Sequence, residues 1–297
     1  MHYKLLEEIS SFISKYHFPI VGVIKTTNKC ELLGTCTMLK LGDQYFLISA
    51  SHVMHLKEKI LNNELWLWNF INQHKYVITE DIIYTPGEDI PNWIDIAIIK
   101  IDHKYYNIPE EYFIQLPRLF YNLKTTKDNK YIITGYPSSK NKKRLNPARL
   151  KLPKLFTFFT DKCKKSNIKK YEELATIICL DYNNHNLIEK GNKLPKPNGM
   201  SGGGVWLLSD KNEFNPLLMA IPIRYDINNK VVNAVKIDFV LAIIKGFFKN
   251  TILDNIDLLI DINEEKGTIS IPHDLINNSF TDIVRDEIAN IYFDDEK

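Results

Sequence analysis

The sequence predicts an all-β protein, because short β-type runs separated by turn residues fill most of it. A first series of such runs lies at residues 19–25, 32–40, 45–49, 65–70, 75–84 and 94–101. A second series follows at 131–137, 148–160, 174–181, 217–224 and 230–237. Strands at this spacing, without helices between them, are typical of an antiparallel barrel or sandwich rather than of βαβ units.

Helical spacing of apolar residues is confined to two places. Residues 3–16 place one apolar set on a single face: Leu5, Leu6, Ile9, Phe12 and Ile13. This pattern predicts an amphipathic helix, which we expect to pack against a barrel; docking of a partner is the alternative. A second helix is predicted over residues 238–249, with Asp238 as its N-cap.

Composition limits the functional classes. The chain has 297 residues, 44% of them hydrophobic and 25% charged, and a net charge of +2. Neither membrane binding nor direct nucleic-acid binding is therefore predicted. No apolar run reaches the roughly 18 residues of a membrane span, and two acids at Glu7 and Glu8 argue against a signal peptide. The four cysteines lack zinc-type spacing. We expect a cytoplasmic protein with reduced thiols.

A serine in a glycine-rich turn is the strongest chemical signal. Residues 198–204 read Asn-Gly-Met-Ser-Gly-Gly-Gly and lead directly into an apolar run. Glycine permits turns and close approaches that a side chain would block, and such a turn can direct backbone N–H groups at one point. A serine hydroxyl also needs a base to accept its proton. His52 ends the apolar run 46–51, and Asp95 lies inside the apolar run 93–99.

The order His52, Asp95, Ser201 is one of the known chain orders of the catalytic triad. At these three points the chain resembles the chymotrypsin/trypsin-like serine peptidases, most closely their bacterial cytoplasmic branch. His52 matches the family's histidine motif, Asp95 its Asp-Ile-Ala-Ile motif and Ser201 its Gly-x-Ser-Gly-Gly motif. The resemblance covers roughly residues 18–248.

The resemblance implies an all-β fold of two antiparallel six-stranded β-barrels. It also implies a serine endopeptidase acting on protein or peptide substrates. His52, Asp95 and Ser201 would be catalytic, and the backbone N–H groups of Gly199 and Ser201 would form the oxyanion hole. No cofactor and no metal are expected.

With this resemblance the chain divides into five parts. They are an N-terminal helix (1–17), a first barrel (18–104), a polar linker (105–130), a second barrel with its closing helix (131–250), and an acidic C-terminal extension of α/β type (251–297).

Three features qualify the resemblance. Ile20-Val21 looks like the new N-terminus of activated trypsins, whose amine pairs with an aspartate directly before the serine. Met200 occupies that position here, so we interpret residues 20–21 as an ordinary strand. The base of the specificity pocket is expected near Pro195, where no acid stands, so a preference for Lys or Arg is not predicted. Pro222, in the run expected to pair with substrate, lacks an N–H.

Other interpretations remain open. Residues 199–203 also fit the G-x-S-x-G elbow of α/β-hydrolases, although a poor strand precedes them and a poor helix follows. His52 and His55 could suggest a metal pair, but the glutamate of H-E-x-x-H and a third ligand are missing. A silent peptidase-fold module that binds or scaffolds in a larger complex is the stronger alternative. A further hypothesis is a latent peptidase that awaits a regulatory protein partner, as accessory proteins of bacterial defence systems do.

Charge is distributed unevenly along the chain. Twelve Lys and Arg residues lie between positions 140 and 170 with a single acid, Asp161, among them. From residue 251 onward, twelve acidic residues accompany three basic ones. The two stretches are either solvated faces or surfaces that meet each other or an oppositely charged partner.

Overall fold

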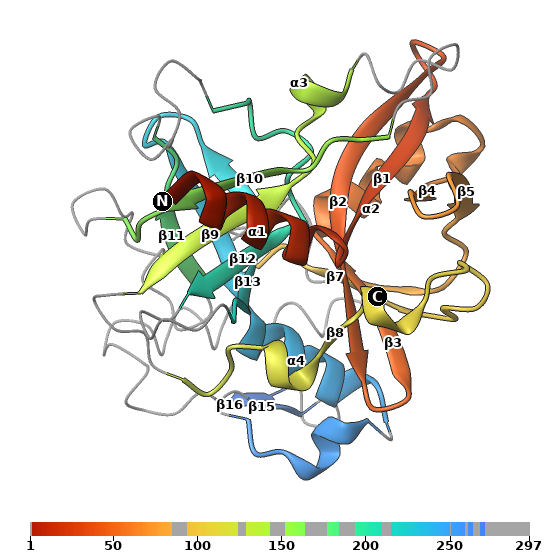
Figure 1. The fold of residues 1–297 in the computed structure, drawn as a ribbon. Coiled ribbons are helices and arrows are strands. Elements are labelled where there is room, and N and C mark those ends of the chain that lie inside the picture. Colours follow the sequence, from red (N-terminus) through yellow and green to blue (C-terminus); the bar gives the residue numbers. More distant parts are fainter. Residues whose placement is uncertain are drawn as a thin grey trace.

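The structure contains two large β-sheets side by side, with one helix across them and a second helix below (Figure 1). A small two-stranded sheet lies near the end of the described chain. The structure is a computed structural model that describes residues 2–84, 94–123, 129–142, 152–163, 177–183, 194–208, 215–249, 251–258, 261–263 and 268–270. The predicted all-β, two-sheet architecture is confirmed.

The first sheet has the strand order β5-β4-β1-β2-β3-β7-β6. Its strands are β1 (His17–Ile24), β2 (Lys29–Leu41), β3 (Gln44–Ser49), β4 (Trp66–Asn69), β5 (His74–Val77), β6 (Ile82–Tyr84) and β7 (Ala97–Ile101). A short β8 (Ile114–Gln115) pairs in parallel with β2. The sheet has eight strands among the described residues rather than six. The predicted run 75–84 is divided into β5 and β6, and β8 forms inside the predicted linker.

The second sheet has the order β10-β9-β12-β13-β14-β11. Its strands are β9 (Lys130–Gly135), β10 (Phe156–Thr160), β11 (Ile177–Asp181), β12 (Gly204–Leu208), β13 (Leu217–Asp226) and β14 (Val231–Lys236). A bridge between Lys162, just after β10, and Leu180 of β11 brings the two outer strands together. The second sheet is thus a six-stranded barrel, as predicted.

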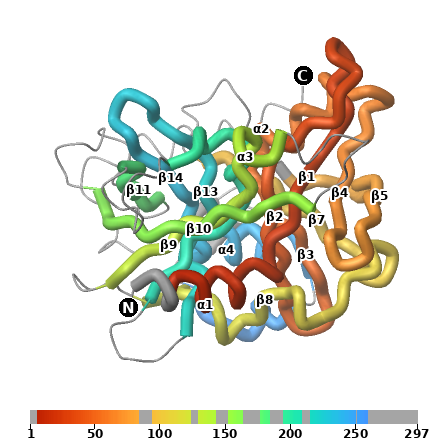
Figure 2. The backbone as a smooth tube through the Cα atoms, turned by 45° about the horizontal axis from the view of Figure 1, so that its top comes forward, coloured from red at the N-terminus to blue at the C-terminus, as the bar shows by residue number. Residues whose placement is uncertain are grey.

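Helix α1 (His2–Ser14) packs onto the sheets rather than projecting from them. It runs alongside β10 toward the first sheet (Figures 1 and 2), and Ser10 Oγ donates a hydrogen bond to Thr157 Oγ1 at 3.0 Å. Ile9 and Ile13 are fully buried. The expected packing of this helix against a barrel is therefore confirmed.

Helix α4 (Ile237–Phe247) follows β14 directly and begins one residue earlier than expected. Its N-cap is Lys236, which makes no side-chain capping bond. Asp238 lies in the first turn and accepts a hydrogen bond from the Asn122 N–H at 2.6 Å. The prediction of Asp238 as N-cap is wrong, because the strand continues to Lys236 and the carboxylate instead satisfies an N–H of the connecting segment.

Short elements complete the described chain. They are α2 (Ser51–His55), η1 (Leu56–Lys59), η2 (Leu61–Asn63), η3 (Glu110–Tyr112), η4 (Leu116–Arg118), α3 (Ser138–Asn141), η8 (Ile252–Asn255), β15 (Asp261–Asn263) and β16 (Thr268–Ser270). Most of the acidic extension, residues 271–297, lies outside the described residues.

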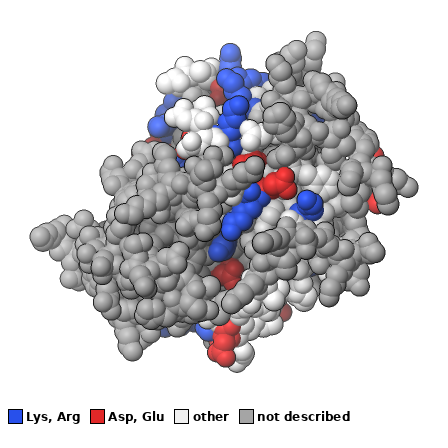
Figure 3. Space-filling view, turned by 90° about the vertical axis from the view of Figure 1, so that its left-hand side faces the viewer, with Lys and Arg blue, Asp and Glu red and all other residues white. Residues whose placement is uncertain are grey.

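The charged surface is described only in part. Residues 143–151 and 164–176 of the basic stretch lie outside the described residues. On the face of Figure 3, the described Lys and Arg side chains lie among Asp and Glu side chains. Asp161, the single acid of the basic stretch, lies 3.9 Å from Lys130 Nζ. Across the described segments, no helix is long and apolar enough to cross a membrane.

One titratable group of the core links stability to pH. His17 is fully buried, and burial lowers the pKa of its imidazole to about 3. Below pH 6.5 the unfolded chain binds a proton at this position that the folded chain does not bind. The stability contributed by the neutral imidazole is therefore complete above pH 6.5 and declines as the pH falls from 6.5 toward 3.

We expect the free energy of unfolding of the wild type to fall by about 2 kcal/mol more than that of His17→Asn between pH 7.5 and pH 5. Urea denaturation at a series of pH values measures this difference. His74→Asn, which changes an exposed histidine, should leave the pH dependence unchanged. Equal pH dependence of the wild type and His17→Asn would contradict the prediction.

Candidate active site

His52 and Asp95 come from neighbouring strands of the first sheet. His52 lies on α2, which follows the end of β3, and Asp95 lies two residues before the start of β7. Ser49 of β3 pairs with Ala97 of β7, so the two segments are adjacent. Asp95 Oδ2 bonds to His52 Nδ1, and Asp95 Oδ1 accepts the His52 backbone N–H at 2.8 Å. The carboxylate thus holds both the ring and the backbone of the histidine.

The contact with Asp95 defines the tautomer of His52. A carboxylate accepts hydrogen bonds, so Nδ1 carries the ring proton and Nε2 is left as an acceptor. The His52 side chain is 42% exposed, whereas the Asp95 side chain is 15% exposed. The arrangement is a solvent-accessible base supported by a shielded carboxylate.

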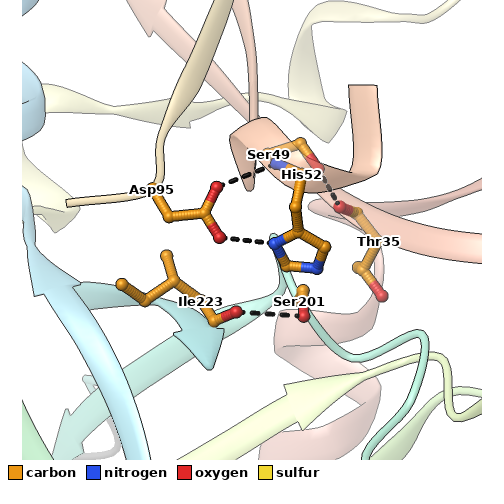
Figure 4. Close-up of polar contacts among 6 residues, drawn as sticks. All are labelled: Thr35, Ser49, His52, Asp95, Ser201 and Ile223. Atoms are coloured by element: carbon orange, nitrogen blue, oxygen red, sulfur yellow. Dashed lines mark hydrogen bonds and ion pairs between the residues drawn. The ribbon is translucent and has the colours of Figure 1, made fainter. Parts of the chain in front are cut away.

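Ser201 lies in the turn before β12 of the second sheet, on the side of the His52 imidazole away from Asp95 (Figure 4). Its hydroxyl donates a hydrogen bond to the Ile223 carbonyl at 3.3 Å. The described structure records no hydrogen bond between Ser201 Oγ and His52. The three residues predicted as a triad are therefore brought to one place, with the serine hydroxyl directed at a backbone carbonyl.

The serine turn is attached to β2 of the first sheet through Thr35. The Thr35 N–H donates to the Ser201 carbonyl at 2.9 Å, and its hydroxyl donates to the Gly199 carbonyl at 2.7 Å. Ser49 Oγ donates to the Thr35 carbonyl at 2.8 Å, which connects this contact to the strand before His52. Hydrogen bonds between the sheets thus position Ser201 relative to His52.

Two glycines of the turn have left-handed backbone conformations. Gly199 has φ +89° and Gly202 has φ +85°. A Cβ on Gly202 would lie 2.0 Å from the Thr35 carbonyl oxygen, so the close contact between the turn and β2 requires glycine there.

The N–H groups of the turn divide into two sets. Met200 N donates to Pro197 O, Gly202 N to Pro222 O and Gly203 N to Met200 O, at 2.8 to 3.0 Å. In the part of the chain that the structure describes, no acceptor is recorded for Gly199 N or Ser201 N. These are the two groups predicted to form the oxyanion hole.

A pocket of about 280 Å³, counted with its open mouth, lies beside Ser201. Its lining is mostly apolar: Ile133, Tyr182, Pro197, Met200, Pro222, Tyr225 and Val232, with Arg224 as the charged member. Pro197 lines the pocket rather than Pro195, whose carbonyl accepts a hydrogen bond from the Tyr182 hydroxyl at 2.8 Å. Among the described residues that line the pocket, none is acidic.

Pro222 lies in β13 opposite Ala234 of β14, next to an irregularity in the strand pairing. β13 pairs with β12 only as far as Ala220, and the register with β14 shifts between Pro222 and Arg224. The Pro222 carbonyl points to the serine turn and accepts the Gly202 N–H. Ile223 is the extra residue of this bulge, and bulges redirect local groups. Here the redirected group is the carbonyl that accepts from Ser201.

The position directly before Ser201 is apolar and buried. Met200 is 3% exposed, and a Cβ on Gly135 would lie 2.9 Å from Met200 Cα. Ile20 and Val21 are both buried inside β1, in agreement with their interpretation as an ordinary strand. His55 is exposed, and within the described segments no group of three or more His, Cys, Asp or Glu residues could hold a metal ion.

Sequence reasoning missed the residues that hold the turn. Thr35 and Thr37 are fully buried on one face of β2, and Ser49 is buried at the end of β3. A signal was present, because two threonines at i and i+2 in an otherwise apolar strand must find hydrogen-bond partners when buried. The sequence does not show that these partners lie in the second sheet.

No protein-family model and no curated protein matches the chain. Among solved structures, it is similar to the serine endoprotease from Yersinia pestis, with TM-score 0.47, 13% identity, and coverage of 86% of this chain and 68% of that one. It is also similar to the HtrA-type protease AlgW with a tripeptide, with TM-score 0.48, 12% identity, and coverage of 82% and 64%. The chain thus spans about two thirds of each.

We expect Gly199→Ala to destabilise the protein more than Gly42→Ala does. Both glycines have positive φ, but a Cβ at Gly199 would lie 2.7 Å from the Tyr136 carbonyl oxygen, whereas the nearest atom at Gly42 is 3.6 Å away. The shared left-handed conformation costs about 1 kcal/mol, and the backbone clash should add roughly 1–2 kcal/mol at Gly199. Urea denaturation of both variants measures the difference; equal losses of stability would be the contrary result.

Proposed function

We propose that this protein is a serine endopeptidase. The observation that carries the proposal is the pairing of His52 Nδ1 with Asp95, next to a serine on a turn whose Gly199 and Ser201 N–H groups have no recorded acceptor in the described chain. A nucleophile, a base, a carboxylate that orients the base and candidate oxyanion donors are the parts that acyl transfer requires.

The mechanism follows from these positions. Ser201 attacks the peptide carbonyl while His52 Nε2 accepts its proton, and His52 then returns the proton to the leaving amine. Asp95 keeps the ring in the tautomer with a proton on Nδ1 and stabilises the imidazolium. The N–H groups of Gly199 and Ser201 stabilise the oxyanion, each contributing about 3 kcal/mol in the transition state. Water then hydrolyses the acyl-enzyme by the same path.

We further propose that the described conformation is a latent state. The Ser201 hydroxyl donates to the Ile223 carbonyl at 3.3 Å, so its proton is directed away from the base. Rotation about the Cα–Cβ bond of Ser201 would redirect the proton to His52. A regulatory protein partner in the cytoplasm that stabilises the rotated state would activate the peptidase, and the substrate would be a protein or peptide.

We predict covalent labelling of Ser201 by a fluorophosphonate probe. Such probes react with a serine that is activated by a base. We expect the wild type to be labelled slowly when purified alone, because its hydroxyl donates to Ile223 rather than to His52, and faster with an activating partner. Ser201→Ala should lose labelling completely, and His52→Ala should lose at least 100-fold in rate. Gel fluorescence and intact-mass spectrometry measure the product.

His55→Ala is the matched control, because His55 lies on the same short helix as His52 and should leave labelling unchanged. A folded wild type labelled only with candidate partners present would support the latent state. A folded wild type that is never labelled, alone or with partners, would contradict the peptidase and favour a binding or scaffold module.

A separate prediction concerns the substrate side chain that enters the pocket beside Ser201. Arg224 is exposed, lines the pocket and has no ion-pair partner among the described residues. Its positive charge disfavours a basic substrate side chain. We expect peptides with Lys before the scissile bond to be cleaved at least tenfold more slowly than peptides with Leu.

The charge reversal Arg224→Glu tests this cause. Exposed charge pairs contribute up to about 1 kcal/mol, so reversing the charge should change the ratio of kcat/KM for Glu and Lys peptides by about tenfold. Lys100→Glu changes an exposed lysine on β7 and serves as the control. An unchanged ratio in Arg224→Glu would show that Arg224 does not contact the substrate.

A further inference from the structure

A second histidine, His17, lies fully buried between the two sheets. It is the first residue of β1, pairs with Thr37 of β2, and contacts Trp206 of β12 edge-on at a ring-centroid distance of 5.7 Å. Trp206 Nε1 lies 3.2 Å from His17 Nε2. An indole nitrogen can only donate, so His17 Nε2 must accept, and the ring proton is on Nδ1.

The direction of this bond sets the direction of the next two. His17 Nδ1 lies 3.0 Å from Thr37 Oγ1 and donates to it. The Thr37 hydroxyl then has its own proton for the carbonyls that follow Ser201, with Gly202 O at 3.0 Å and Gly203 O at 2.9 Å. The result is a chain of donors that runs from Trp206 through His17 and Thr37 to the serine turn.

The surrounding packing leaves His17 little freedom. A Cβ on Gly204 would lie 2.7 Å from His17 Cε1 and 2.5 Å from Trp206 Nε1. The Tyr16 ring stacks on the Trp206 ring, with 5.8 Å between the ring centroids. Burial also keeps the imidazole neutral at neutral pH, which preserves Nε2 as an acceptor.

We propose that His17 is a positioning residue for the reaction of Ser201. It orients the Thr37 hydroxyl toward the Gly202 and Gly203 carbonyls, and so fixes the backbone that directly follows the nucleophile. His17 acts through Thr37 and touches no substrate. The inference rests on the proposed function, because its consequence is the placement of Ser201 relative to His52. Displacements of about 1 Å at such a site can cost 100-fold in rate.

The test uses two matched pairs of substitutions. Thr37→Val removes the hydroxyl and keeps the shape, whereas Thr37→Ser keeps the hydroxyl. His17→Leu removes the ring donor, whereas His17→Asn places an amide donor near the position of Nδ1. We expect Thr37→Val and His17→Leu to lower the rate of fluorophosphonate labelling of Ser201 at least tenfold. Thr37→Ser and His17→Asn should keep most of the wild-type rate.

A double substitution separates positioning from general destabilisation. If His17 acts through Thr37, the variant carrying both His17→Leu and Thr37→Val should label no more slowly than the slower single variant. All rates are measured well below each variant's Tm. Variants with lowered Tm but wild-type labelling rates would show a purely structural role and overturn the proposal.

A readout that does not need catalysis keeps this inference separate from the proposed function. The Gly202 and Gly203 amides donate to Pro222 and Met200, and their hydrogen exchange reports on the order of the turn. We expect exchange at least tenfold faster in Thr37→Val and unchanged in Thr37→Ser. Absence of labelling in the wild type, both alone and with candidate partners, would contradict the peptidase, whereas equal exchange in the two Thr37 variants would overturn the role of His17.

Discussion

The geometry of the site depends on the contact between the serine turn and β2. His52 and Asp95 are held by the first sheet, and Ser201 is held by the second, so their relative position is set only where the sheets meet. Thr35 supplies a backbone N–H and a hydroxyl to Ser201 O and Gly199 O. Each such bond contributes about 1 kcal/mol, but a buried carbonyl left without its donor costs about 1–3 kcal/mol. The hydrogen bonds from Thr35 therefore specify one position of the serine turn against β2 more strongly than they stabilise the fold.

The sequence predicts the two-sheet fold and the members of the site for a physical reason. Strand periodicity and turn residues are local, and His52, Asp95 and Ser201 each lie at or within an apolar run that must become a buried strand. Pairing register is not local. The division of residues 75–84, the parallel strand β8 and the helix start at Ile237 all depend on partners far along the chain. The same is true of Tyr182, which lies directly after β11, 19 positions before Ser201 in the numbering, and lines the pocket.

Among the residues that the structure describes, the turn before Ser201 is held without a charged partner. In activated trypsins an aspartate before the serine pairs with a freed amine, but this chain has Met200 there. Its side chain packs in the core with Tyr182, whose hydroxyl lies 3.7 Å from the Met200 sulfur. Apolar packing on one side and threonine hydrogen bonds on the other replace the ion pair. Such contacts form on folding, so the turn can be placed without proteolytic processing.

If proteolytic processing does not regulate the proposed activity, regulation must act on a weaker contact within the site. The hydrogen bond from Ser201 to Ile223 is suited to this role, because at 3.3 Å it is long and a single side-chain rotation breaks it. It originates in the bulge of β13, on a segment that leaves β12 after Ala220 and so has one edge without a strand partner in the described structure. An extended chain that paired with this edge would straighten the bulge and withdraw the Ile223 carbonyl. For the proposed peptidase activity, binding of a substrate or partner and release of the serine would then be one event, and that activity would remain silent until an extended chain occupied β13.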